Sequence, residues 1–142
     1  MRNRFLYKII DFCKIMFYNL YMLSDFTKMP IDLLTNKVKV CISTLGLNER
    51  YNSFEYLTMI LVYMLKNDTD SIEAFHTALS LIENKFKISE RAICYGINKL
   101  FKMCNKEQIQ TRVQYQLSNN STLNKIRVIK TYILNTLSNV HN

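Results

Sequence analysis

Apolar residues recur every three or four positions along most of the chain, a pattern typical of amphipathic helices. In the first part of the chain the spacing predicts one helix over residues 3–24. Its apolar stripe consists of Leu6, Ile9, Cys13, Met16, Leu20 and Leu23. Aromatic residues beside the stripe widen this apolar surface beyond what one neighbouring helix usually covers. Packing on the core, pairing with a second copy and lodging at a membrane surface all stay open for this helix.

Turn and capping residues divide the middle of the chain. Pro30 suits the first turn of a helix that runs to Leu45, after which Gly46 can supply a left-handed cap. Ser53 is the expected N-cap of a strongly apolar helix over residues 54–66, which we place at the centre of the core.

Three further boundaries complete the helices. Asp70 and Glu73 form a start that resembles a capping box, for a helix that extends to about Lys85. Ser89 is the expected N-cap of a helix over 90–103, and two more helices are expected near 106–117 and over 122–138. The chain is therefore predicted to be all-α, with about six to seven helices in a compact domain.

We expect two parts in this organisation. Residues 1–28 form the amphipathic helix and a linker, and residues 29–142 form the helical domain with a helix-turn-helix at 72–103. The length of 142 residues and the 49% of apolar residues suffice for one real core. Only two Gly and one Pro are present, which also disfavours a β-rich fold.

Charge is distributed unevenly along the chain. Residues 1–84 hold nine Lys or Arg and nine Asp or Glu, whereas 85–142 hold ten Lys or Arg against Glu90 and Glu107. Residues 85–142 therefore carry the whole net charge of +8. A localised positive field favours phosphate-bearing partners, so this balance points to double-stranded DNA. A basic, solvated face without a nucleic-acid partner is the alternative.

Several other classes are disfavoured. The four cysteines are widely separated, with no C-x-x-C pair, and only His76 and His141 accompany them, so we expect no metal, no cofactor and reduced thiols in a cytoplasm. No apolar run is long enough to span a membrane. We find no nucleophile, carboxylate pair or phosphate loop around His76, and we therefore expect no enzymatic activity.

The segment from residue 81 to residue 101 carries the functional prediction. Ile82, Phe86, Ile88, Ile93 and Ile97 are expected to lock two helices together, and Gly96 predicts a close approach of another helix. With Ile93, Ile97 and Leu100 inward, the opposite stripe can read bases or hold phosphate. The predicted DNA-contacting residues are Lys85, Lys87, Ser89, Glu90, Arg91, Tyr95, Asn98, Lys99 and Lys102.

Residues 42–57 contain a further pattern. It begins with Ile42, continues with Leu45-Gly46-Leu47 and a short loop, and ends with Phe54-x-Tyr56-Leu57. This pattern, with the spacing onward to Ile82 and Phe86, resembles the DNA-binding effector domain of the sporulation stage-zero response regulator, protein A. The similarity covers about residues 38–105. It implies an all-α transcription factor that inserts the second helix of its helix-turn-helix into the major groove and binds repeated short sites as dimers.

Two departures from that family change the expectation. When this sequence is aligned with the family without a gap, the arginine-rich face of the family falls on Ala92, Tyr95 and Asn98. An alignment displaced by one helical turn would instead match the family at Glu90-Arg91-Ala92-Ile93, but it would delete four residues from the turn. Residues 1–37 are also too short for the family's phosphoacceptor receiver domain. A homologue without a receiver needs another means of pairing, for which the helix over 3–24 is the candidate.

Two functions follow from these patterns. The first is a DNA-binding transcription regulator, either constitutive or controlled by a partner protein. The second is an interaction module of the same fold that titrates a related regulator and has lost specific DNA binding.

Overall fold

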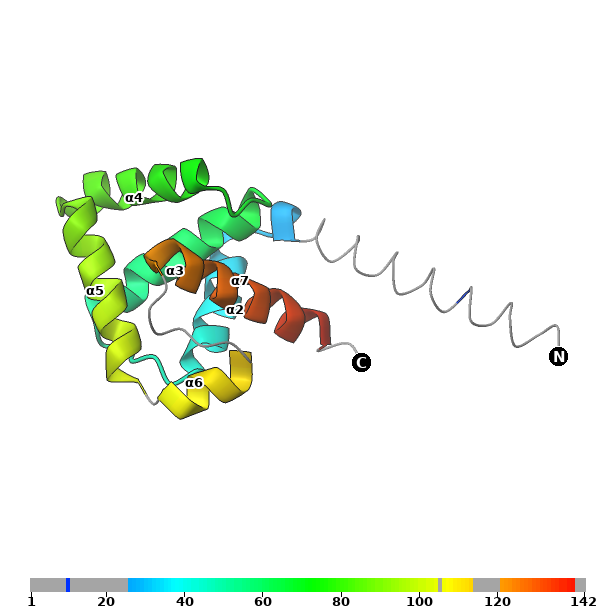
Figure 1. Cartoon of the computed structure of the whole chain (residues 1–142). Coiled ribbons are helices and arrows are strands. Elements are labelled where there is room, and N and C mark those ends of the chain that lie inside the picture. Colours follow the sequence, from blue (N-terminus) through cyan, green and yellow to red (C-terminus); the bar gives the residue numbers. More distant parts are fainter. Residues whose placement is uncertain (1–9, 11–25, 105, 114–120, 140–142) are drawn as a thin grey trace, which may run out of the picture.

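The computed structural model describes residue 10 and residues 26–104, 106–113 and 121–139. These residues form an all-α domain, as predicted (Figure 1). Residues 26–28 are helical, and the longer helices that follow are α2 Ile31–Ser43, α3 Asn52–Lys66, α4 Ile72–Phe86, α5 Glu90–Met103, α6 Lys106–Val113 and α7 Thr122–Asn139. The predicted stripe residues Leu6, Ile9, Cys13, Met16, Leu20 and Leu23 lie outside the described part of the chain.

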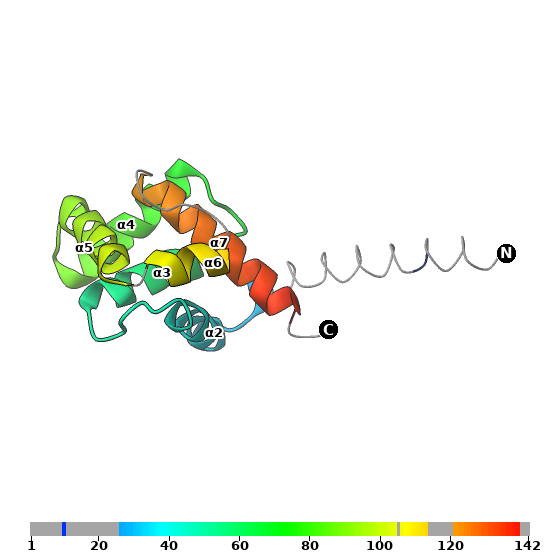
Figure 2. The same ribbon diagram turned by 60° about the horizontal axis from the view of Figure 1, so that its bottom comes forward.

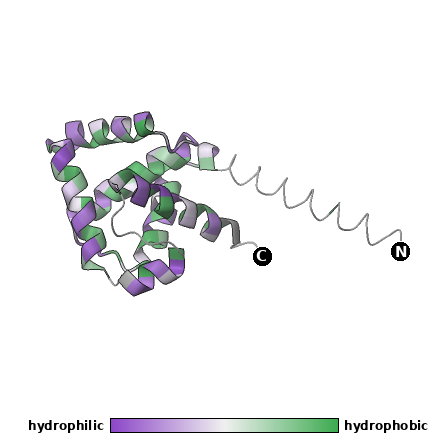
Figure 3. Cartoon of the chain, viewed as in Figure 1, coloured by the Kyte–Doolittle hydropathy of each residue, from purple (hydrophilic) through white to green (hydrophobic). Residues whose placement is uncertain are grey.

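Helix α3 is the centre of the core. It packs against α2, α4, α5 and α7, and nine of its fifteen residues are buried. An apolar helix of this kind has to be covered on most of its faces, so the prediction of a central helix is confirmed. Figure 3 shows polar and apolar residues side by side along the helices, as expected where each buries one face.

The helix boundaries differ from the predicted ones at three capping positions. α2 ends at Ser43, two residues before the predicted Leu45, although Gly46 does adopt the left-handed conformation with φ +87°. α3 begins with Tyr51 as its N-cap, so Ser53 is not the cap. α4 is capped by Ser71, whose Oγ accepts a hydrogen bond from the Ala74 N–H at 3.1 Å, and not by Asp70.

The final helices agree more closely with the prediction. α6 covers Lys106–Val113, and the rest of its predicted range lies outside the described residues. α7 extends over Thr122–Asn139 and buries Ile126, Ile129 and Ile133. Phe26, within the predicted linker of residues 1–28, is only 2% exposed and belongs to the core. The helical domain therefore begins at least three residues before the predicted boundary at residue 29.

Candidate nucleic-acid interface

Helices α4 and α5 are joined by a turn of three residues. Lys87 ends α4 in the left-handed conformation, with φ 56° and ψ 47°, and its N–H donates to the Glu83 carbonyl at 2.9 Å. Ser89 then caps α5, because its Oγ accepts a hydrogen bond from the Ala92 N–H at 3.2 Å. The predicted N-cap and the predicted range 90–103 are thus both confirmed.

Apolar side chains hold this hairpin against the rest of the domain. Ile82, Ile93 and Ile97 are fully buried, as predicted. Phe86 is only partly enclosed: its ring lies edge-on to Tyr56 with centroids 5.2 Å apart, and Lys85 Nζ lies 5.3 Å from its centroid. Three of the predicted locking residues therefore form the core of the hairpin, while Phe86 forms a contact at its edge.

Gly96 explains how closely α5 approaches α3. A Cβ atom added to Gly96 would lie 2.3 Å from Ser53 Oγ, closer than real atoms come. The mid-helix glycine therefore permits the close helix packing that the sequence predicted. Beside this contact a hollow of about 240 Å³ separates the start of α3 from α5, and Lys99 is one of the residues that line it.

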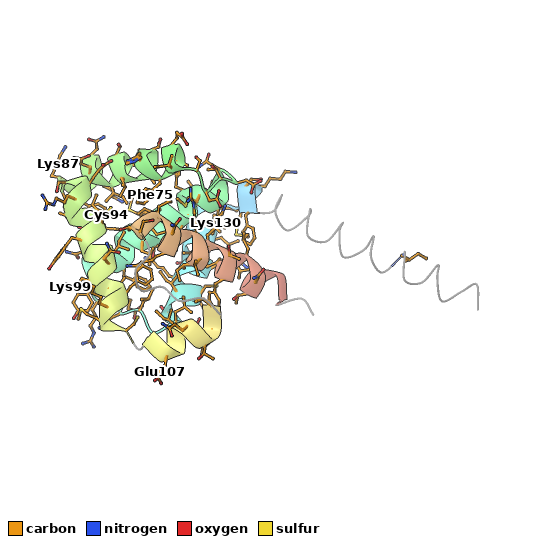
Figure 4. All side chains as sticks on the ribbon, in the orientation of Figure 1. Phe75, Lys87, Cys94, Lys99, Glu107 and Lys130 are labelled. Carbon is orange, nitrogen blue, oxygen red and sulfur yellow. The ribbon has the colours of Figure 1, made fainter. Side chains whose placement is uncertain are left out.

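The outward face of α5 lies along one edge of the domain. Both views place α5 at this edge (Figures 1 and 2). Arg91, Lys99 and Lys102 are exposed, and Tyr95 is 70% exposed. Lys85 and Lys87, at the end of α4, are exposed as well. Figure 4 shows Lys87 at the corner between the two helices and Lys99 on the outer side of α5. We call these six residues the α5 face.

Asn98 does not belong to that face, which corrects the predicted stripe. Its Nδ2 donates to Thr122 Oγ1 at 2.9 Å, and its Oδ1 accepts from Lys125 Nζ at 3.1 Å. The amide thus joins α5 to α7. The prediction omitted Phe101, which is 6% exposed; because it lies close to Asn98 around the helix, its burial turns Asn98 toward α7.

Glu90 and Ser89 have local partners at the start of α5. Glu90 Oε1 lies 3.5 Å from His76 Nδ1 of α4, so this carboxylate faces back across the hairpin. Ser89 Oγ is used in the cap described above. Glu90 is the only acidic residue among residues 84–103. Its carboxylate thus has a partner on α4.

Not all cations of the second half of the chain are available to a partner. Arg127 Nε donates to the Asp70 carbonyl at 2.9 Å, and Lys130 Nζ donates to the Thr69 carbonyl at 3.1 Å. Burial, and after it the nearby charge of Lys102, lower the pKa of Lys125. α7 therefore uses part of the positive charge to satisfy carbonyl groups of the α3–α4 loop and the amide of Asn98. The side chains of Arg127 and Lys130 therefore also have a structural role, which the charge balance of the sequence does not show.

The described cysteines lie in or beside the core. Cys41 is buried, Cys94 and Cys104 are half-buried, and none of these three cysteines forms a disulfide bond. Burial raises the pKa of Cys41 and, together with Glu90, that of Cys94. Over the described ranges, no group of three His, Cys, Asp or Glu side chains could hold a metal ion. None of the helices within those ranges is long and apolar enough to cross a membrane.

Comparison with known protein families, with curated proteins and with solved structures finds no match for this chain.

Proposed function

We propose that the chain is a sequence-specific DNA-binding transcription regulator that lays α5 in the major groove. The observation that supports this most is the α5 face, in which five exposed cations at the end of α4 and on α5 accompany an exposed Tyr95. Arg pairs with guanine, Lys neutralises phosphate, and Tyr contacts phosphate or a thymine methyl group. The three-residue turn also has the length common in helix-turn-helix motifs.

Sporulation control is the context that the family resemblance suggests for this regulator. In that family the second helix of the motif enters the major groove, which corresponds to α5 here. The base-reading role then falls on Arg91 and Tyr95, while Lys85, Lys87, Lys99 and Lys102 hold the DNA backbone. Ser89 and the start of α5 lie where helix N–H groups favour a phosphate.

Pairing of two copies is part of the same proposal. A single small module contacts a short site and binds it weakly, whereas two linked modules on adjacent sites gain affinity through effective concentration. The predicted stripe over residues 3–24 offers an apolar surface for this pairing, which would form a homodimer.

A second function is favoured by the position of Asn98. Its amide is engaged with α7, and the ungapped family register places Ala92, Tyr95 and Asn98 where the family carries arginines. A module with so few base-reading groups could bind a related regulator and titrate it instead of reading DNA. Both functions use the same fold but predict different partners.

Selection of bound duplexes from a random pool separates the two functions. We expect enrichment of a short motif. On that motif Arg91→Ala should lose about 1–3 kcal/mol and relax one base position, whereas Lys102→Ala should weaken all sequences about equally. A pool without enrichment, together with capture of a related regulator, would favour titration. An Arg91→Ala variant with unchanged affinity and preference would remove α5 from the role of recognition helix.

The position of Asn98 leads to a prediction about stability. Asn98→Ala should lower the free energy of unfolding by about 1–2 kcal/mol, because Thr122 and Lys125 lose their amide partner in a half-buried contact. Base preference should not change. Urea denaturation and the selected-motif assay measure the two effects, with Asn36→Ala on the exposed surface of α2 as the control. Relaxed preference at full stability would show instead that Asn98 reads DNA.

A further inference from the structure

A surface groove of about 440 Å³ lies between α2, α3 and α4, and Lys85 at its margin is the one residue that it shares with the α5 face. Val62 is buried in it, with Met59 and Tyr63 half-buried beside it, so α3 forms an apolar floor. Ile31 of α2 and Leu81 of α4 line it as well and are 60% and 52% exposed. Large exposed apolar side chains around an apolar floor are typical of a surface that binds another apolar surface.

The length of the groove suits a helix. Its lining residues extend from Glu55 on α3 to Asn67, the C-cap of this helix, and twelve residues of helix correspond to about 18 Å. A helix laid along this floor would place about three turns in contact. Apolar residues at three-to-four spacing are what such a groove recognises. The predicted stripe from Leu6 to Leu23 has this spacing.

The chain enters the domain at one end of the groove. Ile31, Lys66 and Asn67 line that end, and Lys66 Nζ donates to the Met29 carbonyl at 2.5 Å. Residues 1–25 are thus connected to the domain beside the groove.

We propose that the groove holds the apolar stripe of residues 3–24 from a second copy of the chain. This inference rests on the proposed pairing of two copies and specifies the surface that receives the stripe. The stripe from Leu6 to Leu23 is about 26 Å long as a helix, so one groove of about 18 Å leaves part of it uncovered. Phe12 and Phe17 widen the apolar surface further.

If two copies exchange their stripes, both the groove and the part of the stripe that one groove leaves uncovered are buried. In a two-fold symmetric pair each stripe fills the groove of the partner, and the two predicted helices lie beside one another between the domains. Docking of a stripe in its own groove would leave its outer apolar side in water, which is unfavourable. The exchanged arrangement is therefore the one that buries the stripe and the groove together.

Leu81→Glu tests the groove in the full chain. Leu81 is half exposed, so the substitution places a charge in the groove without opening a cavity in the core. We expect the dissociation constant of the dimer to rise by at least about tenfold, as measured by light scattering over a dilution series. Leu33→Glu is the matched control: Leu33 is 48% exposed on α2 and does not line the groove. The far-ultraviolet circular dichroism of both variants should equal that of the unaltered chain.

Mixing two variants tests the exchange itself. Leu81→Glu retains an intact stripe, and the double variant Met16→Glu, Leu20→Glu retains an intact groove. Each should be mainly monomeric alone, but a mixture should form a heterodimer because one stripe still meets one intact groove. Native mass spectrometry with one variant tagged would detect it. A mixture that stays monomeric, a dimer unaffected by Leu81→Glu, or equal dissociation by Leu33→Glu would overturn the assignment of the groove.

Separate measurements test pairing through the groove and DNA binding by the α5 face. Binding to a duplex with a single site measures the α5 face without pairing, and Ile31→Glu, a groove substitution on α2 that places no charge on α4 beside Lys85, should leave it unchanged. An unaltered chain that is monomeric at every concentration would overturn both the pairing and the groove, whatever its affinity for DNA. Loss of single-site binding in Ile31→Glu would also overturn the groove assignment, because it would place the groove in the DNA interface.

Discussion

Replacing Lys99 and Lys102 together with Glu is expected to reduce duplex affinity by at least about a hundredfold at physiological salt. Both lysines are exposed on the α5 face, so the fold does not depend on their charge. The variant loses two phosphate contacts and places two carboxylates against the DNA backbone. Both changes act in the same direction.

Salt dependence gives a quantitative form of this prediction. The four exposed lysines that hold the DNA backbone predict a slope of log affinity against log salt of about −3.6 for one module, at about −0.9 for each phosphate. Removing two of them should reduce the slope to roughly −1.8. Fluorescence anisotropy of a labelled single-site duplex over a range of salt concentrations measures both the affinity and the slope.

The control for this charge reversal is a pair with the same change in net charge. Lys28→Glu with Lys37→Glu removes two exposed lysines on the α2 side of the domain. This pair should change the slope by less than one phosphate equivalent. If both pairs weaken binding equally, net charge alone attracts DNA and the α5 face has no special role. If neither pair affects the slope, DNA is not the partner of this surface.

Local sequence rules predicted the hairpin well because its signals are local. Ser89 and the periodicity of Ile93, Ile97 and Leu100 lie within the helix that they define, so its range was predicted correctly. The first residue of α4 could not be fixed by local rules, since Asp70 and Ser71 are adjacent and both suit an N-cap. In the structure Ser71 is the N-cap, and its N–H donates a hydrogen bond to Thr69 Oγ1 at 3.3 Å.

Which cations of the candidate site are engaged elsewhere could not be predicted from the sequence, because their partners lie far away along the chain. Lys130 and Arg127 bind carbonyl groups about sixty residues earlier in the chain, a distance over which no local pattern operates. Asn98 was misplaced for a simpler reason, because the inward face of α5 was defined without Phe101. Including every large apolar residue would have centred the exposed face on Tyr95 and Lys99, where the structure has it.

The contrast between the two faces of α5 leads to the second large effect. Ile97→Ala should lower the free energy of unfolding by about 2–4 kcal/mol, because Ile97 is fully buried where α5 meets the core. Removing its outer carbons leaves a cavity that the surrounding helices fill only partly. Urea denaturation should show a lower midpoint with an unchanged m-value, since the folded state keeps the same overall surface.

Tyr95→Ala is the matched comparison for Ile97→Ala, two residues away on the same helix. Tyr95 is mostly exposed, so its loss should change stability by no more than about 0.5 kcal/mol. The effects on DNA should be reversed: Tyr95→Ala weakens binding of a selected duplex, whereas Ile97→Ala binds it normally at temperatures where the variant remains folded. Equal destabilisation by both substitutions would mean that Tyr95 packs against a surface in solution. A loss of binding confined to folded Ile97→Ala would place the inward side of α5, and not its exposed side, in the recognition of DNA.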